Sequence, residues 1–374
     1  MFPLLAALLV AGCGSIIRGE FLDPGKADFD FRHPGCPPPA TPPADSVEVR
    51  YLGSGGVYIA WGPDAILVGP YFSHAGNVVR ALTGNVRFDE KRIREGMDGI
   101  DRDAVLAILV GHSHFDHLAD VPVVVRDYVP HARVHANDSG TNMLASYPIA
   151  AASYEGKQDQ WIPILRRDSS ESAIRFMPVR SAHAPQLCAR DGWPCKYADC
   201  QVDAPWTKGW NEHRLRSLCS GRTYAFVIDL LDAKRENVRY RIYYNDAPAP
   251  PGIGTPRPFA DGHGYDLAIL CMATFNHVAR YPETLLDALK PRHVLISHYD
   301  DFFAKQSGAW RFAPLLSNRR AAWFMTRLRT KLAELAPRPG PPIDPVCGPK
   351  TALWSMPVPH GQLFFTPPAG TSSP

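Results

Sequence analysis

The chain has 374 residues, of which 45% are hydrophobic and 21% are charged, as expected for a globular protein with a large core. Its formal net charge is only +3 and it has no block of Lys or Arg, so no nucleic-acid partner is expected. The 37 prolines are densest at residues 34–43 and 337–345, which predicts linkers or surface wraps near the two ends.

The N-terminus has the pattern of an export signal. The apolar stretch 2–12 is shorter than the roughly 20 residues that a membrane-spanning helix needs. The sequence Leu9-Val10-Ala11-Gly12-Cys13 resembles a bacterial lipobox, in which the cysteine is lipidated and becomes the mature N-terminus. That resemblance implies a signal peptide over 1–12, a proline-rich tether over 13–45, and lipid anchoring at the cell envelope, on the periplasmic face or the cell surface. Because no Lys or Arg precedes the apolar stretch, a plain secretory signal is the alternative.

The eight cysteines fit an exported protein, because disulfides persist in oxidising compartments. Two local disulfides are predicted among the four cysteines of the polar segment 186–220, namely Cys188, Cys195, Cys200 and Cys219. A zinc site there is disfavoured because no two of them form a C-x-x-C pair. Cys36 and Cys347 could join the two proline-rich ends, and Cys271, in an apolar run, is expected to be a buried free thiol.

The globular domain is expected to span residues 46–366, followed by a tail over 367–374. Short strands are predicted at 47–52, 57–61 and 65–68, with turns at 53–56 and 62–64. Seven apolar residues, 104–110, then predict a strand buried on both faces, and a helix is expected over about 118–128.

Between that strand and that helix lies a dense group of potential metal ligands. After Gly111, four of the next six residues are His112, His114, Asp116 and His117. Imidazole nitrogens suit zinc, iron or nickel, and a carboxylate adds a hard oxygen ligand. A buried strand that delivers these groups into one tight turn places them where open α/β sheets bind ligands.

Further polar residues follow the later predicted strands. Strands at 175–179, 238–244 and 293–297 end close to His183, Asp246 and His298 respectively. The other predicted elements are strands at 133–135, 223–231, 267–272 and 361–365, and helices at 137–147, 282–289 and 311–335, the last with a possible break at Pro314. The cysteine-rich insertion 186–220 is expected to form either a rim over the site or a stabilised surface loop.

The motif His-x-His-x-Asp-His resembles the signature of the metallo-β-lactamase superfamily. The resemblance implies an α/β fold, the four-layer αβ/βα sandwich, and two divalent metal ions, with zinc favoured because histidine dominates the ligands. It assigns His112, His114 and His183 to one metal. It assigns Asp116, His117 and His298 to the other, with Asp246 bridging the two.

The segment from the first strands to Gly69-Pro70-Tyr71-Phe72-Ser73 resembles the branch that contains N-acyl-phosphatidylethanolamine phospholipase D. That branch usually has Asp-Pro where this chain has Gly69-Pro70, and the superfamily usually has glycine where this chain has Asn245. The branch also has a histidine at the place of His277, which could donate a proton to a substrate oxygen.

These observations predict an exported, membrane-anchored, metal-dependent hydrolase that uses a metal-bridging hydroxide, with Asp116 orienting the water or accepting its proton. A phosphodiester of the phospholipid kind is the expected substrate, so the partners would be a small-molecule or lipid substrate and the membrane. A lactone or β-lactam hydrolase is the alternative, and a non-catalytic surface lipoprotein that keeps the fold is the second alternative.

Overall fold

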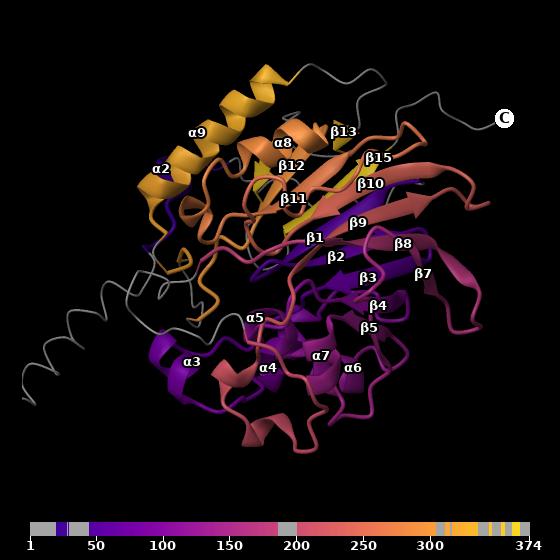
Figure 1. The fold of residues 1–374 in the computed structure, drawn as a ribbon, viewed down its shortest axis with the longest axis vertical. Coiled ribbons are helices and arrows are strands. Elements are labelled where there is room, and N and C mark those ends of the chain that lie inside the picture. The colour runs from indigo at the N-terminus through magenta and orange to yellow at the C-terminus, as the bar shows by residue number, and fades with distance from the viewer. Residues whose placement is uncertain are drawn as a thin grey trace, which may run out of the picture.

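The computed structural model describes residues 20–27, 29, 45–185, 200–303, 311–314 and 316–335, and the backbone of 344–345, 353–355 and 361–366. Two β-sheets pack face to face, and helices cover the outer face of each sheet (Figure 1). The expected four-layer αβ/βα sandwich is confirmed.

The first sheet has eight strands in the order β13-β15-β1-β2-β3-β4-β5-β6. Its pairs are antiparallel from β13 to β3 and parallel from β3 to β6. The strands are β1 (Val47–Gly53), β2 (Gly56–Trp61), β3 (Asp64–Val68), β4 (Val105–Leu109), β5 (Arg133–Ala136), β6 (Ala151–Ser153), β13 (Asp344–Pro345) and β15 (Gly361–Thr366).

The second sheet has seven strands in the order β14-β12-β11-β10-β9-β8-β7. Its pairs are antiparallel from β7 to β10 and parallel from β10 to β14. The strands are β7 (Ile162–Leu165), β8 (Glu171–Arg180), β9 (Tyr224–Leu231), β10 (Val238–Tyr244), β11 (Leu267–Cys271), β12 (His293–Ser297) and β14 (Leu353–Ser355). Consequently β8, β10 and β12 run in the same direction, and their carboxyl ends share one edge of the sheet.

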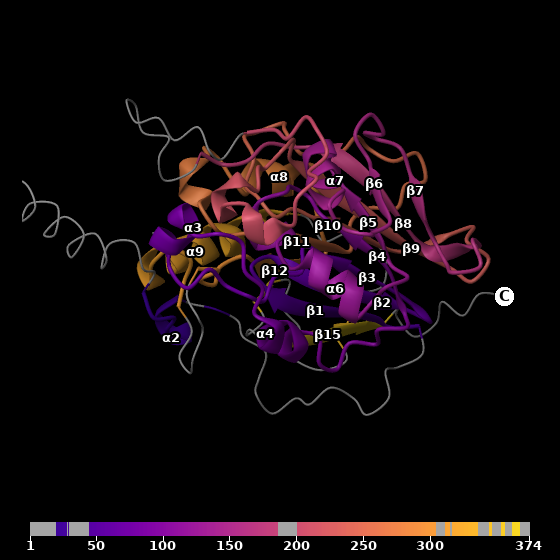
Figure 2. The ribbon, with the colours of Figure 1, turned by 90° about the horizontal axis from the view of Figure 1, so that it is seen from below.

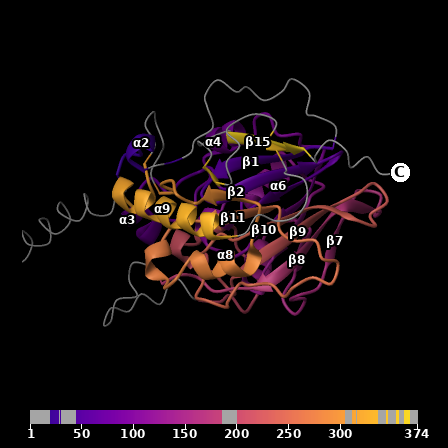
Figure 3. The same cartoon turned by 90° about the horizontal axis from the view of Figure 1, so that it is seen from above.

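Helices form the two outer layers. From below, α4, α6 and α7 lie in front of the first sheet (Figure 2), and from above, α8 and α9 lie across the second (Figure 3). The helices are α2 (Pro24–Ala27), α3 (Val78–Thr83), α4 (Glu90–Gly96), α5 (Phe115–Leu118), α6 (Val121–Asp127), α7 (Asp138–Leu144), α8 (Glu283–Leu289) and α9 (Asn318–Glu334), with 3₁₀ turns η1 (Trp210–Glu212), η2 (Leu215–Ser217) and η3 (Phe275–His277). No helix in these described ranges is long and apolar enough to cross a bilayer.

Side-chain alternation along the strands explains the layers. In β3, Ile66 and Val68 join the cluster between the two sheets, whereas Ala65 and Leu67 join the cluster under the outer helices. Successive residues of a strand point to opposite faces, so an all-apolar strand is buried on both sides. Residues 105–110, which contain β4, are accordingly all buried.

Some predicted elements differ from those observed. The helix expected over 118–128 is two short helices, α5 and α6, and α5 begins at Phe115, so Asp116 and His117 lie in its first turn. The helix expected from residue 311 begins at Asn318, because Ser317 caps it and residues 311 and 312 form β-bridges instead. Helices α3 and α4 and strands β6, β7, β13 and β14 were not predicted.

Part of the expected tether is docked on the domain. The backbone N–H of Asp23 donates to Asn318 Oδ1 over 2.8 Å, which joins α2 to the start of α9. Phe29 is only 8% exposed and its ring lies edge-on to those of Tyr299 and Phe312. Residues 20–27 and 29 therefore belong to the folded body.

The cysteine predictions are partly answered. Cys200 and Cys219 form a disulfide, which uses two of the four clustered thiols, and Cys271 is a buried free thiol as expected. The signal peptide, Cys13, the tail, and Cys36, Cys188, Cys195 and Cys347 lie outside the described residues.

Candidate metal centre

The turn after β4 presents the first four potential ligands. Gly111 starts it, because a Cβ there would lie 2.5 Å from Asp246 Oδ2 and 2.8 Å from the Tyr224 carbonyl oxygen. His114 is the N-cap residue of α5, and the helix then carries Asp116 and His117 on its first turn, both buried. An acidic residue in a helix's first turn is favoured by the local dipole.

The other three potential ligands reach the same place from the second sheet. His183, Asp246 and His298 lie just beyond β8, β10 and β12, whose carboxyl ends share one edge. The seven side chains form three overlapping groups in which the candidate ligand atoms lie within 4.8 Å of one another: His112, His114 and His183; His112, His117 and Asp246; and Asp116, His117 and His298.

Individual contacts show how tightly the groups converge. His112 Nδ1 lies 3.1 Å from Asp246 Oδ1, and His117 Nδ1 lies 3.8 Å from Asp246 Oδ2. His298 Nε2 lies 3.3 Å from Asp116 Oδ2. Asp246 thus lies between the two histidine-rich groups, which is the position the resemblance implied for a bridging carboxylate.

Seven buried polar atoms of four side chains in this cluster lack hydrogen-bond partners among the described residues. Within the described chain, no hydrogen bond reaches either ring nitrogen of His112 or His117, either carboxylate oxygen of Asp246, or Nδ1 of His298. Leaving a buried donor or acceptor unsatisfied costs about 1–3 kcal/mol, and buried polar groups are almost always bonded. Unbonded nitrogen and oxygen atoms that lie this close together are suited to bind cations, which would serve as their missing partners.

The protonation states also suit cations. Burial lowers the pKa of His112 well below its usual value and lowers that of His117 to about 3, so both imidazoles are neutral. Burial raises the pKa of Asp116, but His117 and His298 more than offset this and hold it well below the usual range. Neutral imidazole and ionised carboxylate are the forms that bind metal.

A buried network fixes His298, which has a positive φ of 55°. Tyr51 OH donates to Asp300 Oδ1 over 2.5 Å and accepts from the His298 backbone N–H over 2.7 Å. Asp300 also accepts from the Ser54 N–H, and Tyr51 OH accepts from Gly55 N–H. Through this network, β1 holds His298 in the left-handed backbone conformation, which a residue other than glycine seldom adopts without such support.

Asp120 supports the ligand turn from the other side. Its carboxylate accepts from the backbone N–H groups of Phe72 and Ser73 over 2.6 and 2.8 Å, and from Ser73 Oγ over 2.6 Å. At position 69, where the resemblance led us to compare with an aspartate, the chain has glycine. Gly69 has φ of 50°, and a Cβ there would lie 3.1 Å from His117 Nδ1.

Asn245, the residue before Asp246, has a structural role. Its Oδ1 accepts from the Cys271 backbone N–H over 3.1 Å, and its Nδ2 donates to the Ala247 carbonyl over 3.3 Å. These bonds tie the ends of β10 and β11 on either side of Asp246, so the side chain orders the backbone that presents the carboxylate.

His277 lies beside the loop that carries His183. Its Nδ1 is 2.7 Å from the Pro185 carbonyl oxygen, two residues beyond His183, and this bond places the ring proton on Nδ1. Nε2 is then the nitrogen left to face a ligand. His183 is fixed in the same way, because its Nδ1 lies 2.7 Å from the Ala184 carbonyl oxygen.

The described part of the cysteine-rich insertion packs on the outer helices. Trp210 is fully buried, and its Nε1 donates to the Met143 carbonyl oxygen in α7 over 2.8 Å. The insertion ends at the ligand turn, where the Ser113 N–H donates to the Ser220 carbonyl oxygen over 2.8 Å. The segment from 200 to 220 therefore braces the turn from outside.

Aromatic rings flank the cluster at His298. The Phe302 ring lies 4.9 Å from the His298 ring, and Phe115 lies 6.2 Å from Phe302 and 5.6 Å from Phe303, centroid to centroid. All three phenylalanines are partly exposed. The site thus has an apolar wall beside its histidines.

No protein-family model matches the chain, and no curated protein matches its sequence. Among solved structures, the metallo-β-lactamase fold protein YhfI from Bacillus subtilis is similar with a TM-score of 0.44 and 11% identity, over 86% of this chain and 99% of that one. Igni18, a metallo hydrolase from Ignicoccus hospitalis, has a TM-score of 0.41 and 12% identity over 79% and 96%. CmlA, a diiron β-hydroxylase from Streptomyces venezuelae, has a TM-score of 0.44 and 11% identity, over 86% of this chain and 54% of that one. Likenesses at this level do not bear on substrate or metal.

Proposed function

We propose that this chain is a metal-dependent hydrolase that binds two divalent cations. His112, His114 and His183 would hold one cation, and Asp116, His117 and His298 the other, with Asp246 shared. The observation that carries the proposal is the convergence of seven potential ligand side chains. Buried nitrogen or oxygen atoms of four of them, His112, His117, Asp246 and His298, have no hydrogen-bond partner among the described residues. Zinc is the favoured metal because imidazole dominates the ligand set.

Two divalent cations supply a water activated near neutral pH and stabilise negative charge that develops on a substrate. The chain's own groups supply the proton handling. Asp116 is ionised, since its pKa lies well below the usual range, so its carboxylate can accept a hydrogen bond from the attacking water and orient it. The low pKa makes it a weak base, so orientation of the water is the role that we propose for it. His277, with Nδ1 held by Pro185, presents Nε2 toward substrate and can donate to an oxygen if it is protonated.

A phosphodiester of the phospholipid kind is the proposed substrate. Asp116 and Asp246 contribute two negative charges against four positive charges from two divalent cations, which leaves +2. A bridging hydroxide would reduce this to +1, which still attracts an anion. The apolar wall of Phe115, Phe302 and Phe303 suits a substrate with a hydrocarbon part. The alternative is a lactone or β-lactam, because the same activated water can attack a carbonyl carbon.

The third possibility is a surface lipoprotein that keeps the fold without catalysis. The unpartnered ligand atoms weigh against it, because such atoms destabilise a protein that binds no cation. Lipidation at Cys13 and anchoring in the bacterial cell envelope belong to the proposal in either case. Replacing Cys13 by Ser should release the protein from membranes, and unchanged fractionation would contradict the anchor.

The metal proposal is tested by elemental analysis of the full chain purified without chelator. We expect about two divalent ions per chain in the wild type and fewer in His114→Ala, with hydrolytic activity reduced by at least about 100-fold. His131→Ala is the matched control, because His131 is a partly exposed histidine on the loop before β5. This variant should keep full metal content. A metal-free wild-type protein would refute the proposal.

Substrate class is decided by a panel. The metal-loaded protein is assayed on bis-p-nitrophenyl phosphate, an acyl-phospholipid and several lactones. Turnover of phosphodiesters that falls in His277→Ala, with metal content unchanged, would support the proposed substrate and the role of His277. Rapid lactone hydrolysis without phosphodiester cleavage would replace the first proposal by its alternative.

A further inference from the structure

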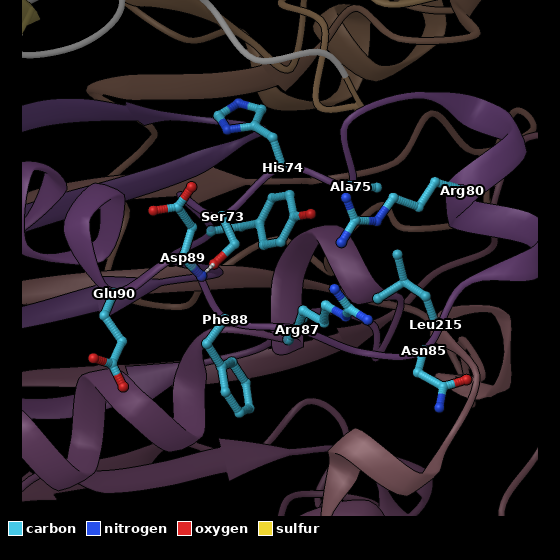
Figure 4. Close-up of a pocket in the computed structure, with 12 residues that line it drawn as sticks. Ser73, His74, Ala75, Arg80, Asn85, Arg87, Phe88, Asp89, Glu90 and Leu215 are labelled. Atoms are coloured by element: carbon cyan, nitrogen blue, oxygen red, sulfur yellow. Dashed lines mark hydrogen bonds between the residues drawn. The ribbon is translucent and has the colours of Figure 1, made fainter.

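A separate pocket of about 360 Å³ lies between the segment that follows β3 and helix α3. Its wall includes Tyr71 and Ser73 from that segment, Arg80 from α3, and Arg87 from the loop before α4. Figure 4 shows the guanidinium groups of Arg80 and Arg87 directed into this space from opposite sides. None of the seven proposed metal ligands lines it.

The two arginines are solvent-exposed residues and have no charged partner among the described residues. Across the described residues, neither guanidinium has an ion pair or a side-chain hydrogen bond. The pocket's two acids are already paired: Asp89 Oδ2 lies 3.3 Å from Arg92 Nε, and Glu90 Oε1 lies 3.7 Å from Arg126 Nη2. Two like charges facing one concave space repel each other, and an anion between them would relieve that repulsion.

The floor of the pocket is rigid. Ser73 Oγ donates to Asp120 and accepts from the Asp89 backbone N–H over 2.8 Å, which joins the segment after β3 to the start of α4. Tyr71 below it is buried, and its ring packs edge-on to that of Phe115. A preformed floor lowers the entropic cost of ordering a ligand.

We infer that this pocket binds a phosphate monoester group between Arg80 and Arg87. Such a group carries about −1.5 to −2 charges at pH 7, which matches two guanidinium ions, and guanidinium binds its oxygens in pairs. The group could belong to a soluble compound or to a lipid headgroup. The lipid source is considered because Val79 and Leu82, beside Arg80 on α3, are 59% and 48% exposed.

Isothermal titration of the full, metal-loaded chain with inorganic phosphate and with glycerol 3-phosphate tests the inference. Arg80→Ala and Arg87→Ala should each weaken phosphate binding by about tenfold or more. Arg87→Lys should weaken it less, because lysine keeps the positive charge but cannot donate the paired hydrogen bonds of a guanidinium group. Arg94→Ala, exposed on α4 outside the pocket, is the control and should bind as the wild type does.

Phosphate also suits a metal centre, so His114→Ala is titrated in parallel. Binding that survives in His114→Ala and is lost in the two arginine variants supports the pocket, whatever the outcome for metal content or hydrolysis. Binding unchanged in both arginine variants, or lost only in His114→Ala, overturns the inference. Co-sedimentation with phosphatidic acid vesicles separates the two sources. Arginine-dependent binding to the vesicles but not to glycerol 3-phosphate indicates a lipid headgroup. Arginine-dependent binding to glycerol 3-phosphate that is as strong as binding to the vesicles indicates a soluble compound.

Discussion

Asp120 is a fully buried carboxylate that joins the ligand turn to the segment after β3. Burial raises its pKa to about 6, although the donors at Ser73 and Phe72 act in the opposite direction. A folded-state pKa above the usual 3.8 means that the folded protein binds this proton more tightly than the unfolded chain. The contribution of Asp120 to stability is therefore complete below about pH 4 and is lost as the pH rises through about 6.

This shift predicts a pH-dependent difference between wild type and Asp120→Asn. The wild type should lose stability relative to the variant as the pH rises from about 4.5 to 7, by on the order of 3 kcal/mol at most. Urea unfolding of both proteins across that pH range measures the difference in the free energy of unfolding. Both proteins have the same metal centre, so its titration contributes equally to each and cancels in that difference.

Asp103→Asn is the control for that comparison, because the Asp103 carboxylate is 91% exposed. Its stability should run parallel to that of the wild type at every pH. A difference for Asp120→Asn that is flat with pH, or that favours the wild type increasingly at higher pH, would contradict the assigned direction of the pKa shift.

At the scale of elements, β1 and the loop after β12 act as one unit through Tyr51 and Asp300. The hydroxyl of Tyr51 makes one donated and two accepted hydrogen bonds in a buried place, and one of them reaches the His298 backbone. Removing the hydroxyl leaves the N–H groups of Gly55 and His298 without this acceptor. The His298 imidazole is then less firmly aimed.

Tyr51→Phe should consequently weaken both folding and metal binding. We expect a loss of about 1–3 kcal/mol in the free energy of unfolding and about 10- to 100-fold in metal affinity. Tyr147→Phe also loses a hydroxyl that accepts a backbone N–H, but from Trp210 in the outer layer, and should leave metal affinity unchanged. Equal effects of the two variants on metal affinity would show that Tyr51 does not position His298.

The same elements show how far the sequence could predict the site. The strand ends before His183, Asp246 and His298 are local patterns that periodicity predicts, whereas the choice of these residues as ligands came from the resemblance to the metallo-β-lactamase superfamily. Tyr51 and Asp300 are 249 residues apart, and neither has a local signature of pairing. Asp120 had one available signal, since it is a lone acid between the apolar residues 118–119 and 121–125.

Helix boundaries were harder to predict for a related reason. Helix α3 is only six residues long and α4 has a single large apolar residue, and both helices start where the side chains of Asn77 and Asp89 accept from the Arg80 and Arg92 N–H groups. Such caps resemble ordinary polar loop residues in a sequence. The pocket between α3 and the segment that follows β3 was accordingly not predicted.

At the scale of the whole molecule, the N-terminal segment and α9 close one end of the sandwich together (Figure 1). Phe29 inserts among Tyr299 and Phe312, and Tyr299 stacks on Tyr51 with ring centroids 5.5 Å apart. Composition alone predicts a tether for this segment, yet its Phe29 contacts Tyr299, which in turn contacts Tyr51 of the network that holds His298. Composition reports the average polarity of the segment, whereas its docking depends on a few individual contacts, among them the buried ring of Phe29 and the bond from Asp23 to Asn318.

Phe29→Ala should therefore destabilise the domain by about 3 kcal/mol, through the lost burial and the cavity left behind. Phe21→Ala, in the same segment but 53% exposed, should cost clearly less. Urea unfolding measures both, and metal affinity should fall in Phe29→Ala because Tyr299 and Tyr51 lose their packing support. If Phe29→Ala is as stable as Phe21→Ala, the segment is a tether after all, and its docking does not contribute to the stability of the fold.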